Sequence, residues 1–191
     1  RILAFTRDWL SRSPYSSHAM VARARALANA GLALRGQGPA RDIYPEALRR
    51  FLDLHAEAFA LAESAYQSDP YFLPATDAIM ELGLTTGRQA SAYEILAATM
   101  RRQPNWETLE RALNLVNPAY GGVLEDVSFL CGKFGPMIED GPSDNMARYC
   151  KIIAMQKYFR DGNAQVLSEL LQAEPAPELD RIRVQLALWT Y

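Results

Sequence analysis

The chain has 191 residues, of which 49% are hydrophobic and 22% are charged, and its formal net charge at pH 7 is −2. This composition excludes intrinsic disorder, and a chain of this length buries enough surface to fold without a disulfide framework. Two cysteines do not supply a zinc site of four thiolates, and we do not expect the two histidines to complete one, so we expect neither a metal nor a cofactor.

Apolar residues recur at three- and four-residue spacing between the glycines and prolines, which predicts an all-helical chain. The first helix is expected over residues 2–12, and the second follows a serine cap at Ser16 or Ser17 and ends near Leu34. The third begins at Pro45 and carries one apolar stripe. The residues of this stripe are Leu48, Phe51, Leu52, His55, Phe59 and Ala62. Later helices are expected over residues 74–85, 88–102, 105–116, 122–134, 144–160, 163–173 and 178–190.

Two segments of the chain match each other at an interval of 34 residues, which is the period of tetratricopeptide repeats. Small or apolar residues stand at equal distances before Pro70 and before Pro104. They are Ala58, Ala62 and Ala65 in the first segment and Ala92, Leu96 and Thr99 in the second. Small residues allow neighbouring helices to approach closely. Together with the short connections, they predict a right-handed α-solenoid, a tetratricopeptide-like stack of antiparallel helix pairs.

Motifs between the helices carry a resemblance to a known family. They are Trp9, Ser13-Pro14-Tyr15-Ser16, Leu34-Arg35-Gly36-Gln37-Gly38-Pro39-Ala40 and Asn117-Pro118-Ala119-Tyr120-Gly121-Gly122. Over residues 5–160 the chain resembles a bacterial family of uncharacterised helical proteins with tetratricopeptide-like architecture, although that family usually has a tryptophan near the position of Tyr120. The resemblance implies a bacterial origin and a helical binding scaffold, and it brings no catalytic residue. In size and acidity the chain is also similar in type to immunity proteins that neutralise bacterial toxins.

The longest stretch without a charged residue runs from Ala112 to Leu124 and is well short of the roughly 20 apolar residues that a membrane span requires. We therefore expect no membrane partner. The short connections between the predicted helices also lead us to expect a single helical-repeat domain over residues 1–191. The sequence begins at Arg1 rather than at methionine, which leaves open a leader or a further N-terminal segment. Two cysteines without an evident partner favour a reducing compartment, so we expect a cytoplasmic protein, with the periplasm as the alternative.

Charge is unevenly distributed along the chain. Residues 1–50 contain nine arginines and three acidic residues, a local net charge of +6, whereas the remaining residues carry −8. Arginine forms bidentate pairs with carboxylates, while the acidic remainder of the chain would repel nucleic acid. This pattern favours an acidic protein surface as the partner and no nucleic acid. Solvated helix faces are the alternative explanation.

Aromatic residues in loops are the second group of candidate contacts, because large aromatic side chains are common anchors of protein interfaces. The candidate protein-binding residues are Arg23, Arg25, Arg35, Arg49, Arg50, Tyr71, Phe72 and Tyr120. The alternative for the three aromatic residues is that they fill gaps between helix pairs.

No motif indicates catalysis, and we expect no catalytic residue. Gly36 and Gly38 follow a helix rather than a strand and lack the lysine of a phosphate loop, so Gly36 is predicted to end that helix. His55 lies on the apolar stripe, which is typical of a hydrogen-bonded core residue rather than a base. Cys131 and Cys150 lie on apolar helix faces and are expected to be small, unpaired hydrophobic residues.

The sequence thus predicts a non-enzymatic helical scaffold that binds another protein stoichiometrically. Its most concrete form is a bacterial immunity protein that neutralises a toxin with an acidic surface. The first alternative is an enzyme or small-ligand-binding domain with a site in the concavity of the solenoid, around His55, Glu57 or Tyr93. The second alternative is an adaptor or chaperone that binds peptide segments in a groove.

Overall fold

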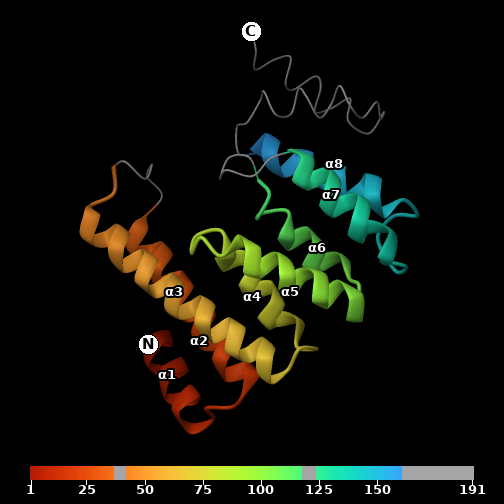
Figure 1. Cartoon of the computed structure of the whole chain (residues 1–191). Helices are drawn as coiled ribbons and strands as arrows, with labels where there is room; N and C mark the ends of the chain where they lie inside the picture. The colour runs from red at the N-terminus through yellow and green to blue at the C-terminus, as the bar shows by residue number, and fades with distance from the viewer. Residues whose placement is uncertain (37–41, 118–123, 161–191) are drawn as a thin grey trace. The chain divides into compact units, whose positions relative to one another are not determined.

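The computed structural model describes residues 1–36, 42–117 and 124–160 (Figure 1). The regular structure in these ranges is helical and contains no β-strand, which confirms the predicted all-α class. None of the helices in the described part of the chain combines the length and the hydropathy that a membrane span needs.

The contacts divide the chain into two compact units, Arg1–Gln103 and Pro104–Tyr191. We describe each unit by itself, and the single domain expected from the sequence stays a prediction.

The described part of the first unit contains five α-helices, which match every predicted bound to within two residues. They are α1 (Ile2–Arg12), α2 (Ser17–Arg35), α3 (Pro45–Ser68), α4 (Leu73–Gly83) and α5 (Gln89–Arg102). The predicted end signals are confirmed: the Ser16 hydroxyl accepts a hydrogen bond from the backbone N–H of Ala19 at the start of α2. Gly36 ends that helix with a φ of 68°, a left-handed conformation that glycine adopts without steric cost. Pro45 is the first residue of α3.

The core of the first unit forms where α2 packs on α3 and α4 packs on both α3 and α5. All six residues of the internal sequence match are fully buried there. The hydroxyls of Thr76 and Thr99 form a buried hydrogen bond of 3.1 Å between α4 and α5. The Ser91 hydroxyl also donates to the Glu63 carboxylate at 3.0 Å, which places α5 beside α3. The prediction is wrong for one residue of the apolar stripe of α3. Leu52 lies at the margin of this stripe and is 44% exposed.

The second unit is likewise helical in the part that the structure describes. Its described elements are α6 (Trp106–Ala112), α7 (Leu124–Phe134), the 3₁₀ helix η3 (Gly135–Met137) and α8 (Met146–Arg160). The helix expected over residues 105–116 ends early, because the backbone N–H groups of Asn114 and Leu115 donate three residues back and tighten the chain into turns. The helices predicted over 163–173 and 178–190 lie outside the described residues.

Cys131 of α7 and Cys150 of α8 form a disulfide, with their Cα atoms 5.5 Å apart. Both residues are fully buried, as expected, but the prediction that they are unpaired is wrong. The helical periodicity placed each cysteine on an apolar face, yet only the packing of α7 on α8 brings the two faces together. The cysteines therefore give no support to a reducing compartment, and the cytoplasmic location stays a prediction.

Candidate binding surfaces

Two of the predicted arginines, Arg23 and Arg35, interact with other groups of the first unit. Arg23 is largely covered: its guanidinium donates to the carbonyl of Leu3 at 2.8 Å and lies 3.7 Å from the carboxylate of Glu57. The guanidinium of Arg35 donates to the carbonyl of Gly36 at 3.1 Å and lies over the ring of Phe51. These contacts fix α1 to α2 and α2 to α3 rather than present charge to a partner.

The other three predicted arginines are exposed. Arg49 forms an ion pair of 2.8 Å with Glu46, one turn earlier in α3. Arg25 of α2 and Arg50 of α3 have no hydrogen bond or ion pair with any described residue. The structure therefore does not present the five arginines as one basic surface, and two of them are available for a partner.

The aromatic candidates also separate into different roles. Phe72 is half-buried against the cluster of Met20, Val21, Ala65 and Ala75, so it fills a gap between helices. Tyr71 is exposed, and its backbone carbonyl accepts a hydrogen bond from the side chain of Gln103. Tyr120 lies outside the described residues.

His55 is the hydrogen-bonded core histidine that the apolar stripe predicted. Its ring is 3% exposed, Nε2–H donates to the carbonyl of Ala28 at 3.2 Å, and Nδ1 lies 2.8 Å from the hydroxyl of Thr85. Because a carbonyl only accepts, Nε2 carries a proton, and Nδ1 of a neutral ring is an acceptor that faces the Thr85 hydroxyl, which also lies 3.1 Å from the carbonyl of Leu82. Burial lowers the pKa of His55 below its usual range, and the bond to Ala28 opposes this shift.

The alternative site around His55 and Glu57 does not form. Residues two positions apart on a helix point to nearly opposite sides. Accordingly, His55 contacts α2 and the turn that follows α4, whereas the carboxylate of Glu57 is more than half exposed and lies near Arg23. Tyr93, the third residue of that hypothesis, is half-buried on α5.

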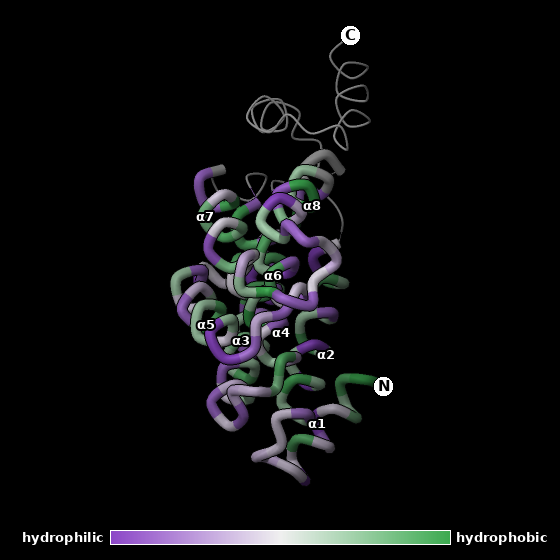
Figure 2. The backbone as a smooth tube through the Cα atoms, turned by 90° about the vertical axis from the view of Figure 1, so that its right-hand side faces the viewer, coloured by the Kyte–Doolittle hydropathy of each residue, from purple (hydrophilic) through white to green (hydrophobic). Residues whose placement is uncertain are grey.

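Helix α1 carries an apolar surface that the sequence analysis missed. Ile2, Phe5 and Trp9 stand at helical spacing on one face and are 71%, 66% and 37% exposed. We call these three residues the α1 strip. Figure 2 shows hydrophobic stretches along α1, which packs on α2 at the edge of the first unit. Thr6 is the one buried residue of this helix, so the strip takes no part in the core.

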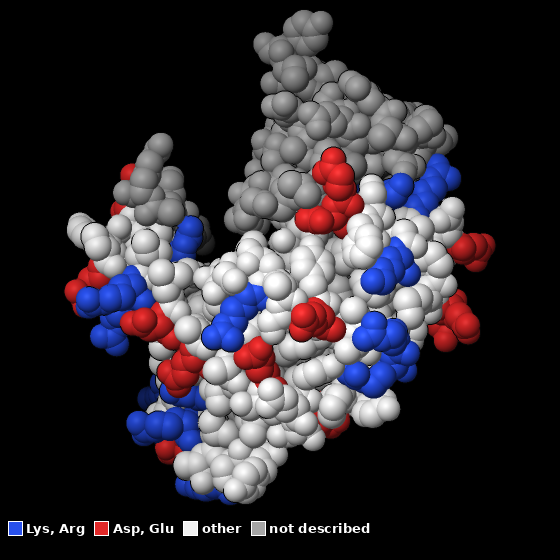
Figure 3. Space-filling view, viewed as in Figure 1, with Lys and Arg blue, Asp and Glu red and all other residues white. Residues whose placement is uncertain are grey.

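Charge and shape surround the α1 strip. Arg7 and Arg12 are exposed on the same helix, and the exposed Arg1 precedes it; Figure 3 shows basic side chains gathered where Figure 1 places α1. Phe5 and Trp9 form a hollow of about 300 Å³ together with Asp8 and Arg12. The signal that could have found this surface is the spacing of Ile2, Phe5 and Trp9 in a helix that contributes little else to a core.

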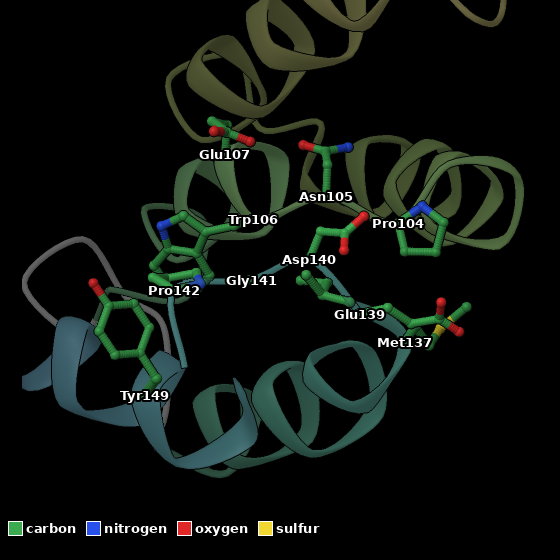
Figure 4. Close-up of a pocket in the computed structure, with 11 residues that line it drawn as sticks. Pro104, Asn105, Trp106, Glu107, Met137, Glu139, Asp140, Gly141, Pro142 and Tyr149 are labelled. Atoms are coloured by element: carbon green, nitrogen blue, oxygen red, sulfur yellow. The ribbon is translucent and has the colours of Figure 1, made fainter. Parts of the chain in front are cut away.

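The second unit contains a larger cavity, with a volume of about 730 Å³ (Figure 4). Its walls are residues 104–107 at the start of α6, residues 137–142 after η3, and Tyr149 of α8. The side chain of Asn105 caps α6 by accepting a hydrogen bond of 2.8 Å from the backbone N–H of Thr108. This cap holds the first turn of α6, which lines the cavity.

Aromatic and acidic side chains line this cavity. The rings of Trp106 and Tyr149 meet edge to face with centroids 4.9 Å apart. Figure 4 shows these rings along one side of the cavity and Glu139 and Asp140 on the other, with Glu107 near the start of α6. No group of three side chains in the described residues is arranged to hold a metal ion. The sequence analysis had assigned Glu139 and Asp140 to no site, because they converge with Trp106 only in the fold.

No family model, no curated protein and no solved structure matches this chain. The resemblance to a bacterial tetratricopeptide-like family therefore stays a prediction. Functional inference rests on the two surfaces described above, the α1 strip and the cavity of the second unit.

Proposed function

We propose that this protein is a non-enzymatic scaffold that binds another protein through α1. The observation that carries this proposal is the α1 strip, which exposes Phe5, Trp9 and Ile2 on a helix that carries two exposed arginines and follows a third. Exposed apolar residues that lie together commonly mark interaction sites, and tryptophan and arginine are enriched among the residues that dominate binding energy. The partner that fits has an apolar groove with an acidic rim.

A protein fits this surface better than a lipid membrane does. Asp8 lines the hollow beside the strip, where it would be repelled by anionic lipid, and this hollow suits a side chain rather than a flat surface. A second copy of the chain fits poorly too. Residues 1–36 hold six arginines and one acidic residue, so two such faces would repel each other.

The helical-repeat character of the first unit is part of this proposal. The close approach of α3 and α5, through Glu63 with Ser91 and through Tyr66 with Arg102, supports a tetratricopeptide-like pairing of helices. Such scaffolds serve stoichiometric binding, and neutralisation of a bacterial toxin is the most concrete form of this function. In this interpretation Arg25 and Arg50 are further exposed basic contacts, while Arg23 and Arg35 join helices and Arg49 pairs with Glu46 within α3.

The test is an affinity capture with three versions of the full chain from an extract of the cells that make it. One version has the natural sequence, the second carries Phe5→Ser and Trp9→Ser, and the third carries Leu32→Ser and Leu34→Ser. Leu32 and Leu34 are exposed apolar residues of α2, so the third version removes a similar amount of apolar surface elsewhere. Removing two aromatic anchors should weaken binding of the purified partner by about thirtyfold or more.

The expected result is one partner, bound in equal stoichiometry, that is lost with the α1 variant and kept with the α2 variant. Circular dichroism should be the same for all three versions, because the substituted residues are exposed. Equal affinity of the α1 variant would remove the strip as the docking surface. Binding to anionic vesicles with the same dependence on Phe5 and Trp9 would replace the protein partner by a membrane.

A further inference from the structure

The walls of the cavity in the second unit come from separate segments and leave about 730 Å³ open. Sites for small molecules or for side chains of a partner have volumes of this order. Residues 137–142 form one wall, and they lie within the loop that the disulfide between Cys131 and Cys150 closes. The disulfide therefore restrains the ends of the segment that carries this wall.

The charge of the cavity has one sign. Glu107, Glu139 and Asp140 line it, and none of its lining residues is a lysine or an arginine. None of these three carboxylates forms an ion pair or hydrogen bond with a described residue. Carboxylates concentrated in a hollow raise the local concentration of cations and disfavour anions.

The aromatic side of the cavity supplies a second, independent preference for positive charge. Trp106 and Tyr149 are half-buried and keep part of their rings toward the cavity (Figure 4). The face of an aromatic ring carries negative charge density, and tryptophan attracts cations most strongly among the aromatic side chains. An organic cation can lie against such a ring face while its N–H groups donate hydrogen bonds to the carboxylates on the other side of the cavity.

A metal ion does not fit this arrangement. The carboxylates of Glu107, Glu139 and Asp140 are spread around the walls, and no three acidic, histidine or cysteine side chains in the described part of the chain meet at one point. A metal needs its ligands within a few ångströms of a single centre. Charges distributed around a wide hollow, with rings on one side, match an extended cation instead.

We propose that this cavity binds an organic cation that carries an ammonium or guanidinium group. The cationic group lies against Trp106 and Tyr149, and Asp140 and Glu139 accept its hydrogen bonds from the opposite side. The cation is either a free polyamine or the basic side chain of a protein. The cavity belongs to the second unit and does not involve the α1 strip.

Titration calorimetry of the full, disulfide-bonded chain tests this site with three probes. N-acetyl-arginine amide represents a protein side chain, spermidine represents a free polyamine, and N-acetyl-citrulline amide has the shape of the first probe without its charge. Both cations should bind and the citrulline compound should not. The tighter of the two cations identifies the source, a side chain or a polyamine.

Variants locate the site. Asp140→Asn removes an exposed charge of the cavity and should weaken both cations about tenfold, and Trp106→Leu should do the same through the lost ring face. Asp144→Asn is the matched control, since Asp144 is an exposed acid of the same connection that does not line the cavity. Circular dichroism establishes that each variant is folded.

Three outcomes would overturn the proposal. The first is equal binding of the citrulline and arginine compounds. The second is an equal loss of affinity for Asp144→Asn and Asp140→Asn, which would mean that the cations respond only to net charge. The third is no binding of either cation by the folded chain at millimolar concentration.

Discussion

The two units of this chain hold their helices together by different means. In the first unit, long helices approach closely through buried alanines, and polar contacts such as that of Glu63 with Ser91 join α3 to α5. In the second unit, a disulfide joins α7 and α8, which are connected through η3 and the irregular residues 138–145. Repetition of small residues stabilises one unit, whereas a single covalent link restrains the other. The repeated small residues are visible in the sequence as a period of 34 residues, whereas the pairing of the two cysteines is not visible there.

The largest expected effect tests this contrast directly. Replacing both Cys131 and Cys150 by alanine should lower the free energy of unfolding of the second unit by about 3 kcal/mol, because the open loop gains entropy when unfolded. Hydrogen exchange read by mass spectrometry should show amide protection in α7 and α8 falling by about a hundredfold. Protection in α2 and α3 should stay the same.

The natural chain treated with reductant under unfolding conditions serves as the control for the double variant. A uniform loss of protection from α2 to α8 would show that the two units unfold together. The two units would then differ in the interactions that hold their helices together but not in their stability.

The next largest effects are expected at two glycines where helices touch. A Cβ atom on Gly135 would stand 2.7 Å from the backbone nitrogen of Ala147, and one on Gly31 would stand 2.8 Å from the ring of His55. Backbone yields less than a side chain, so Gly135→Ala should cost about 3 kcal/mol of unfolding free energy and Gly31→Ala about 2 kcal/mol. Urea denaturation of each variant measures these changes.

Gly132→Ala is the control for both substitutions. Gly132 lies in α7 with open space around its Cα, so alanine should stabilise the chain by about 0.5–1 kcal/mol through helix propensity. A stabilising effect of Gly31→Ala as well would mean that His55 moves aside freely and that α2 and α3 are not in close contact there.

The smallest effect is expected from pH and concerns the first unit. The pKa of buried His55 is lowered from 6.5, chiefly by desolvation, so the unfolded chain binds this proton more tightly than the folded chain. The stability due to the neutral ring is therefore complete above about pH 6.5 and is lost as pH falls from there through the lowered folded pKa. Urea denaturation at about pH 8 and about pH 5 should show this loss in the natural chain.

His55→Gln should show a smaller loss between the same two pH values, because glutamine does not titrate. His18 is present in both chains, and its contribution cancels in the difference. An identical pH dependence in the two chains would contradict a pKa of His55 lowered by burial.

Much of the fold was predictable from local patterns. Ser16, Gly36 and Pro45 marked the ends of helices correctly, since caps and φ preferences act within a few residues. His55 was predictable as a core residue because it shares a stripe with Phe51 and Phe59. These features depend on neighbours along one helix, which the sequence contains.

The candidate sites were much less predictable. Arg23 and Arg35 were expected to face a partner, but the interactions of their guanidinium groups depend on where the chain folds back. A count of charge along the chain does not distinguish Arg23 from the exposed Arg25. The exposure of Phe5 and Trp9 was missed because a helical spacing of apolar residues predicts a buried face, and only packing tells which face is covered.

The sequence by itself determined the all-helical class, the main helix bounds, the buried positions of the internal match and the core role of His55. Tertiary structure alone decided the pairing of Cys131 with Cys150, the exposure of the α1 strip and the meeting of Trp106 with Tyr149 beside Asp140. The physical reason is the sequence separation over which each kind of interaction acts. Helix formation and amphipathicity are set by residues a few positions apart, whereas a disulfide, an uncovered face and a cavity depend on which distant segments the packing brings together.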